Sequence, residues 1–177
     1  MAPFLSPPKI QEEERQQRLA LLQGKLKDRH IGGLLLGSTP SLQYFTGLVW
    51  RSSERFLGAL VTPSELIYIV PGFERSRVES LPHLSGEIRG WEEEENSAAL
   101  IASLLPAGAS LAVDDAIPLF AYNLLRQEIA PERLLDGGHC RRADIGIILA
   151  HILPSTEIDP QADGNRDDRP YDKQNPT

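Results

Sequence analysis

The stretch that decides the fold is residues 33–62, GLLLGSTPSLQYFTGLVWRSSERFLGALVT. It begins with an apolar run at residues 34–36 and ends with a second one at residues 56–61. Short apolar runs bounded by Gly, Pro and polar residues are typical of buried strands. Between them, residues 42–45 form a short amphipathic turn that stops at Gly47. Two buried strands joined through a helical turn predict the centre of an α/β sheet.

The flanking patterns extend this centre to a mixed sheet of about six strands with helices on both faces. Further strands are expected at residues 66–70, 87–91, 110–114 and 133–136. The strand at 66–70 should pair antiparallel with 56–61, because only a short turn at Thr62-Pro63-Ser64-Glu65 joins them. The strand at 87–91 is predicted near a sheet edge.

Helices are predicted between these strands, each with one apolar face. Residues 10–28 repeat leucine at helical spacing, with Glu14 and Arg18 placed for an i,i+4 ion pair. Shorter helices are expected at 73–81, 98–105 and 115–129. The side chains expected to point inward from the first and last of these are Phe73, Val78, Leu81, Leu119, Tyr122, Leu125 and Ile129.

Composition limits the classes of function. A chain of 177 residues with 41% hydrophobic content predicts one globular domain with a tail. The net charge of −7 argues against nucleic acid and against an anionic membrane as partners. One cysteine, Cys140, excludes an internal disulfide, and the start of the chain has neither the basic nor the apolar region of a signal peptide. We therefore expect a cytoplasmic protein.

Two segments resemble the creatinase/prolidase family. Ser41-Leu42-Gln43-Tyr44-Phe45-Thr46-Gly47 is similar to the family's N-x-x-Y-L-T-G-F segment, and Ile69-Val70-Pro71-Gly72-Phe73-Glu74 to its lv-P-x-x-E segment. The resemblance covers roughly Arg18 to Gly138 and implies the amino-terminal domain of Xaa-Pro dipeptidases, aminopeptidases P and creatinases. It also implies a homodimer, a peptide substrate in the full-length parent, and a separate catalytic domain that holds two divalent metal ions, Mn²⁺ being expected.

The residues themselves predict no catalytic group, metal ligand or cofactor in this chain. No H-E-x-x-H, C-x-x-C, G-x-S-x-G or phosphate-binding glycine motif occurs. The cluster His139, Cys140, Asp144 and His151 fits no standard zinc spacing. The acidic run at residues 92–95 is interpreted as a solvated helix start rather than as a metal site, since consecutive helical residues do not face one another.

The charged loop at residues 49–55 is the candidate substrate edge. Trp50, Arg51 and Arg55 lie in the loop that leads into the predicted strand at residues 56–61, so a rigid sheet would support them. Arginine binds carboxylates in a bidentate manner, so this loop could close over a peptide carboxylate. The resemblance supports this role, because the family's amino-terminal domain lends residues to the catalytic cleft. The alternative is that Trp50 packs down while the charged side chains are solvated.

The chain is divided into residues 1–140, an amino-terminal domain; 141–159, a linker towards an absent catalytic domain; and 160–177, a disordered tail. Ile152-Leu153-Pro154-Ser155-Thr156-Glu157-Ile158 resembles the family's I-K-S-x-x-E-I junction. The polar tail is either genuine or the product of a shifted reading frame. The predicted function is a non-catalytic domain that shapes the substrate cleft and dimer interface of an Xaa-Pro metallopeptidase. The alternative is a stand-alone α/β binding module with no peptidase role.

Overall fold

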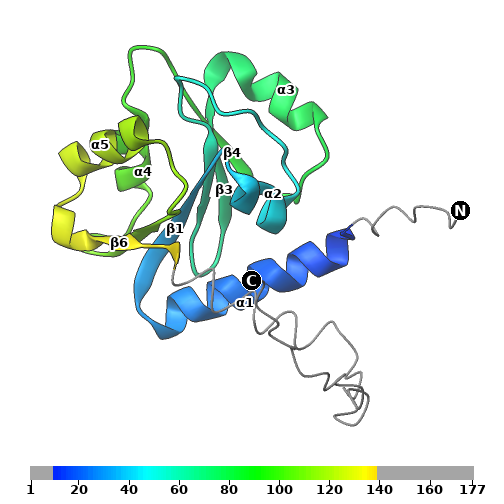
Figure 1. Cartoon of the computed structure of the whole chain (residues 1–177), viewed down its shortest axis with the longest axis horizontal. Helices are drawn as coiled ribbons and strands as arrows, with labels where there is room; N and C mark the ends of the chain where they lie inside the picture. The colour runs from blue at the N-terminus through cyan, green and yellow to red at the C-terminus, as the bar shows by residue number, and fades with distance from the viewer. Residues whose placement is uncertain (1–9, 139–177) are drawn as a thin grey trace, which may run out of the picture.

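The computed structural model describes residues 10–138, which form one six-stranded mixed sheet with helices on both faces (Figure 1). The strand order is β4-β3-β2-β1-β5-β6. Pairs β1–β2 and β2–β3 are antiparallel, whereas β3–β4, β1–β5 and β5–β6 are parallel. The strands are β1 (Ile31–Gly37), β2 (Gly58–Val61), β3 (Leu66–Pro71), β4 (Glu87–Trp91), β5 (Ser110–Val113) and β6 (Leu134–Asp136). The predicted fold class is confirmed.

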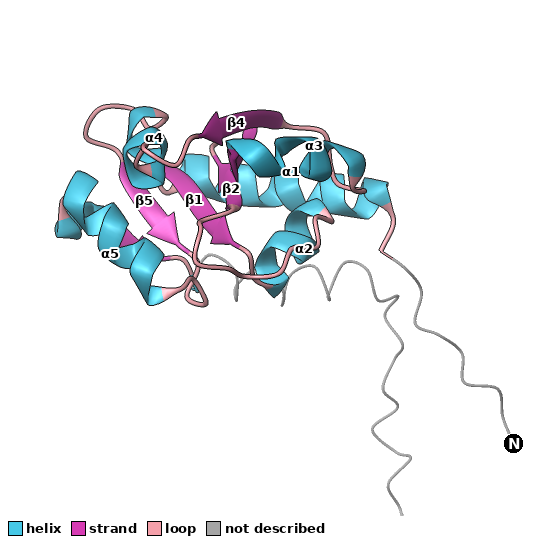
Figure 2. Ribbon diagram, turned by 90° about the horizontal axis from the view of Figure 1, so that it is seen from above, coloured by secondary structure: helices cyan, strands magenta, loops and turns pink. Residues whose placement is uncertain are grey.

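Alternate residues of the central strands enter two separate cores, one on each face of the sheet. Leu34 and Leu36 pack with α1 (Glu12–Asp28), α2 (Pro40–Thr46) and α3 (Arg75–Ser80). Leu35, between them, packs on the opposite face with α4 (Ser97–Ser103) and α5 (Leu119–Glu128). Figure 2 shows the two groups of helices on either side of the strands. The apolar run is uninterrupted because both faces of the strand are buried.

Local signals fix both ends of α2. The Thr39 hydroxyl accepts a hydrogen bond from the Ser41 amide at 3.2 Å, and Pro40 occupies the first turn, where no amide partner is needed. Gly47 ends the helix in the left-handed region, with φ of 83°. The predicted turn and its stop at Gly47 are therefore confirmed.

The predicted ion pair between Glu14 and Arg18 forms on α1. Arg18 is almost completely buried, because its guanidinium also lies over the Tyr44 ring, 3.9 Å from the ring centroid. Its Nη1 donates to the Tyr44 carbonyl oxygen at 3.3 Å. Arg18 therefore links α1 to α2, in addition to pairing with Glu14 within α1.

Two inward-facing predictions are wrong. Phe73 is 67% exposed, whereas Val78 is fully buried. Five residues at 100° each place Phe73 about 140° from Val78 around a helix, and residues Gly72–Glu74 form a separate 3₁₀ turn. Leu119 is 71% exposed, because Ala121 and Leu125 form the buried face of α5 instead.

Two predicted helix starts also lie too early. The last helix begins at Leu119 rather than at residue 115, since Pro118 is in an extended conformation, with ψ of 140°. A proline also disfavours helical geometry at the residue before it, which here is Ile117. Residues 92–95 precede α4 as an exposed turn, and Asn96 caps that helix by accepting from the Ala98 amide at 2.9 Å.

Candidate functional site at the Trp50–Arg55 loop

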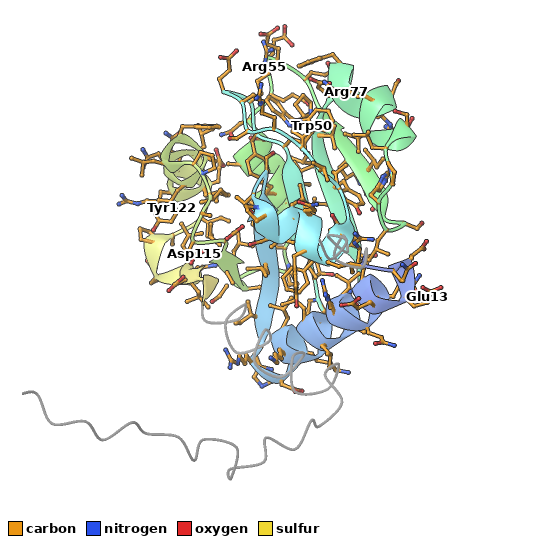
Figure 3. The ribbon with its side chains drawn as sticks, turned by 45° about the vertical axis from the view of Figure 1, so that its right-hand side comes forward. Glu13, Trp50, Arg55, Arg77, Asp115 and Tyr122 are labelled. Atoms are coloured by element: carbon orange, nitrogen blue, oxygen red, sulfur yellow. The ribbon has the colours of Figure 1, made fainter. Side chains whose placement is uncertain are left out.

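The loop that connects α2 to β2 contributes one wall of a surface depression. Its volume is about 140 Å³, and its lining comprises Trp50, Ser53, Glu54, Arg55, Leu57, Pro71, Phe73 and Glu74. Trp50 and Arg55 lie at the same end of the molecule in Figure 3. The third predicted residue, Arg51, is exposed and is not among the residues that line this depression.

Two guanidinium groups stack on two aromatic rings at this site. Arg55 lies 5.1 Å from the centroid of the Phe73 ring. Arg77 lies 4.8 Å from the centroid of the Trp50 ring, and both of these side chains are labelled in Figure 3. Arg55 also forms an ion pair with Glu93. Stacking orients each guanidinium while its edge stays available for hydrogen bonds. A carboxylate ligand of Arg55 would therefore have to displace Glu93 or share the cation with it.

Trp50 is partly buried and packs against the core that contains α1 and α3. The Trp50 ring thus packs against this core and also lines the depression, so it has features of both alternatives considered from the sequence. Phe73 and Arg77 were not predicted as site residues. The signal that could have revealed Phe73 is its angular offset from Val78, which directs it away from the core at the end of β3.

The lining of the depression combines apolar surface with one cation, Arg55, and two carboxylates, those of Glu54 and Glu74. Trp50, Leu57, Pro71 and Phe73 supply apolar surface, and Arg55 supplies the positive charge. A second hollow of about 330 Å³ lies beyond Glu54 and is lined by Phe56, Trp91, Glu94, Glu95, Asn96, Ser97, Phe120 and Leu124. That hollow is lined by Glu54, Glu94 and Glu95 and by no Lys or Arg side chain, whereas the depression has Arg55 beside Glu54 and Glu74. The arginine side of the loop is therefore the candidate site for a carboxylate.

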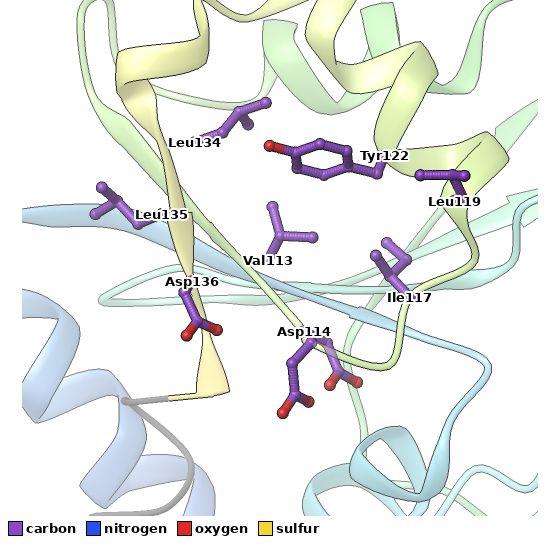
Figure 4. Close-up of a pocket in the computed structure, with 9 residues that line it drawn as sticks. Val113, Asp114, Ile117, Leu119, Tyr122, Leu134, Leu135 and Asp136 are labelled. Atoms are coloured by element: carbon purple, nitrogen blue, oxygen red, sulfur yellow. The ribbon is translucent and has the colours of Figure 1, made fainter.

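Another hollow, of about 320 Å³, lies where β5 and β6 end (Figure 4). Its lining is partly apolar and partly acidic: Val113, Asp114, Asp115, Ile117, Leu119, Tyr122, Leu134, Leu135 and Asp136. Asp114 is buried and accepts a hydrogen bond from the Thr39 hydroxyl at 2.5 Å. This bond joins the loop after β1 to the loop after β5 at the base of the hollow.

Within residues 10–138, no three His, Cys, Asp or Glu side chains are grouped closely enough to hold a metal ion. The described residues therefore do not fit the two-metal site that the family resemblance implies for a catalytic domain. The cluster His139, Cys140, Asp144 and His151 lies outside the described residues. The helices of the described part include none that is long and apolar enough to cross a membrane.

Comparison with known families gives a match over most of the chain. Residues 18–142 match the model of the creatinase/prolidase N-terminal domain. The chain belongs to this family. Among curated proteins it is similar to an uncharacterized peptidase of Schizosaccharomyces pombe, with 29% identity over 102 residues. That match covers 49% of this chain and 23% of the yeast protein.

Solved structures share the fold of this creatinase/prolidase N-terminal domain. The dipeptidase PepE of Mycobacterium ulcerans superposes with a TM-score of 0.69 at 19% identity, covering 77% of this chain and 38% of that one. The N-terminal domain of an X-Pro dipeptidase from Streptococcus pyogenes superposes with a TM-score of 0.60 at 18% identity. The superposed region comprises 72% of this chain and 98% of the S. pyogenes domain. The chain thus spans well under half the length of the yeast peptidase and of PepE.

Proposed function

We propose that this chain supplies the amino-terminal, non-catalytic domain of an Xaa-Pro metallopeptidase. In this function the loop at residues 49–55 forms the substrate edge of a cleft whose catalytic groups come from a separate domain. The proposal rests on one observation: Trp50 and Arg55 line the same depression, in a domain of this family. An apolar surface beside a guanidinium matches a short peptide that ends in a ring and a carboxylate.

The remaining parts of the proposal follow from the family resemblance. The catalytic domain would bind two divalent metal ions, Mn²⁺ being expected, and would activate water for hydrolysis. The amino-terminal domain would also contribute to the contact between two copies in a homodimer. A cytoplasmic location agrees with the single cysteine of the chain.

A domain exchange tests the substrate-edge role. Residues 10–138 replace the corresponding domain of the full-length S. pyogenes X-Pro dipeptidase, and hydrolysis of Xaa-Pro dipeptides is measured with Mn²⁺. In this chimera, Arg55→Ala should raise KM about 10-fold with little change in kcat, because a charge-assisted contact to the bound substrate is lost. Arg89→Ala is the matched control, since Arg89 lies half-exposed on β4 and pairs with Glu87.

The isolated chain serves as the blank and should show no turnover with or without Mn²⁺. Turnover that copurifies with it would contradict the non-catalytic assignment. Equal KM values for the Arg55→Ala and Arg89→Ala chimeras would contradict the substrate-edge role. A correctly folded chimera without any activity would favour the stand-alone binding module.

A further inference from the structure

We propose that the hollow of about 330 Å³ beyond Glu54 binds a small primary amine that carries an apolar body. We call it the acidic hollow, after the carboxylates of Glu54, Glu94 and Glu95 in its lining. The ammonium group of the ligand would lie at the glutamates, and its apolar body would lie against the aromatic side chains. The inference does not depend on which reaction the parent protein catalyses.

Four segments of the fold build the acidic hollow. They are the loop before β2, the end of β4, the turn that leads into α4, and the first half of α5. The helices α4 and α5 lie side by side (Figure 1). Ligand sites in proteins have volumes of about 300–1,000 Å³. The acidic hollow is therefore large enough for a small organic molecule.

One wall of the acidic hollow is apolar. Phe120 and Leu124 lie four residues apart on α5, so they share one face of the helix, and both are partly exposed. Phe56 and Trp91 complete the wall and are almost completely buried. The Trp91 indole donates to the Phe56 carbonyl oxygen at 3.1 Å, which links the end of β4 to the chain before β2. This wall suits an aromatic or aliphatic group of the ligand.

The charge of the acidic hollow favours a cation. Its lining contains no Lys or Arg side chain. Within residues 10–138, Glu54 and Glu94 form no ion pair and no side-chain hydrogen bond. Glu95 accepts one hydrogen bond, from the Glu92 amide at 2.8 Å, and a carboxylate has further acceptor sites. An ammonium ion would therefore find carboxylates that are still able to accept from it.

Ser97 gives an independent indication of a ligand. It lines the acidic hollow and is only 5% exposed. In the part of the chain that the structure describes, its hydroxyl has no hydrogen-bond partner. On its inner side, Ser97 faces a space that is otherwise lined by apolar side chains and does not admit a water molecule. Because buried hydroxyl groups are normally hydrogen-bonded, the partner of Ser97 has to come from the acidic hollow.

The spacing of the acceptors matches a primary ammonium group. Glu94, Glu95 and Ser97 belong to four consecutive residues, which span at most about 11 Å even when fully extended. A primary ammonium group has three N–H donors, as the side chain of lysine does. A quaternary ammonium group has the same charge and no donor. The acidic hollow should therefore prefer a primary amine to its trimethylated analogue.

Isothermal titration calorimetry of the full chain with phenethylamine tests the proposal, at pH 7 and low ionic strength, where an aliphatic amine is protonated. The N,N,N-trimethyl analogue of phenethylamine should bind at least about 5-fold more weakly, because it cannot donate hydrogen bonds. Glu94→Gln should weaken the binding of both cations about 3-fold. Ser97→Ala should weaken phenethylamine about 5-fold and leave the Kd of the trimethyl analogue unchanged.

Glu132→Gln is the matched control, since Glu132 is an exposed glutamate outside the acidic hollow. It should change neither Kd, and cooperative urea unfolding verifies that every variant folds. The proposal is overturned by the absence of saturable phenethylamine binding below about 10 mM, or by equal affinities for the two cations. It is also overturned if Glu94→Gln and Ser97→Ala leave the affinity for phenethylamine unchanged, or if Glu132→Gln weakens it as much as they do.

Discussion

Gly58→Ala should lower the free energy of unfolding by about 3–4 kcal/mol, a large part of the total for a domain of this size. Gly58 lies in β2, between Gly37 of β1 and Ile69 of β3. A Cβ atom at this position would overlap the carbonyl oxygen of Leu36 and crowd the Phe56 ring. The overlap with backbone cannot be relieved by a side-chain rotation, so the central strands would have to move apart.

Urea unfolding followed by tryptophan fluorescence measures this effect. Trp91 is a suitable reporter, because its indole is buried and donates to the Phe56 carbonyl oxygen at 3.1 Å. Gly24→Ala is the matched control: Gly24 is exposed inside α1, and nothing lies within 4 Å of a Cβ placed there. This substitution should stabilise the domain by about 0.5–1 kcal/mol through helix propensity. A Gly58→Ala midpoint equal to that of the native chain would show that β1 and β2 are not packed as described.

Tyr68→Phe should lower the free energy of unfolding at neutral pH by about 1–3 kcal/mol. Tyr68 is fully buried in β3, and its hydroxyl donates to the Leu84 carbonyl oxygen at 2.8 Å. Leu84 precedes β4, and its own amide donates to the Thr46 carbonyl oxygen at 2.7 Å. Removal of the hydroxyl leaves a buried carbonyl oxygen without that partner and loosens the connection between α3 and β4.

The effect of Tyr68→Phe should depend on pH. Burial raises the pKa of Tyr68 above its ordinary value, an effect only partly offset by a hydrogen bond with Thr46. In the unfolded chain tyrosine ionises near pH 10. The stabilising contribution of the neutral phenol is therefore complete below pH 10 and decreases as the pH rises further, by up to about 1.4 kcal/mol per pH unit.

Unfolding curves of both proteins between pH 8 and pH 11 check this dependence. Above pH 10 the stability of the native chain should decrease more steeply than that of Tyr68→Phe, so the difference between them narrows. Burial also raises the pKa of Tyr44, but that residue is common to both proteins and does not contribute to the difference. Parallel curves throughout this range would contradict the assigned environment of Tyr68.

The candidate site could be predicted from sequence only in part. Trp50 and Arg55 were identifiable because a charged loop next to a buried strand must lie at the surface near the end of the sheet. Phe73 and Arg77 belong to a 3₁₀ turn and a helix that lie 18 to 27 residues further along the chain. Phe73 lines the same depression and Arg77 stacks on Trp50, because β2 and β3 pair antiparallel and the start of β2 therefore lies beside the end of β3.

The sequence by itself determined the elements whose signals are local. The doubly buried strand at Leu34–Leu36, the Thr39-Pro40 start and Gly47 stop of α2, and the antiparallel pairing of β2 with β3 all depend on residues close together in the chain. Only the tertiary structure decided that β5 lies beside β1, which brings Asp114 to Thr39 across 75 positions of sequence. Hydrophobic period and capping residues describe a segment and its nearest neighbours, whereas strand order depends on which distant segments bury each other's apolar faces. For that reason the hollow at the ends of β5 and β6, and the stacking of Arg77 on Trp50, have no signature in any single stretch of the chain.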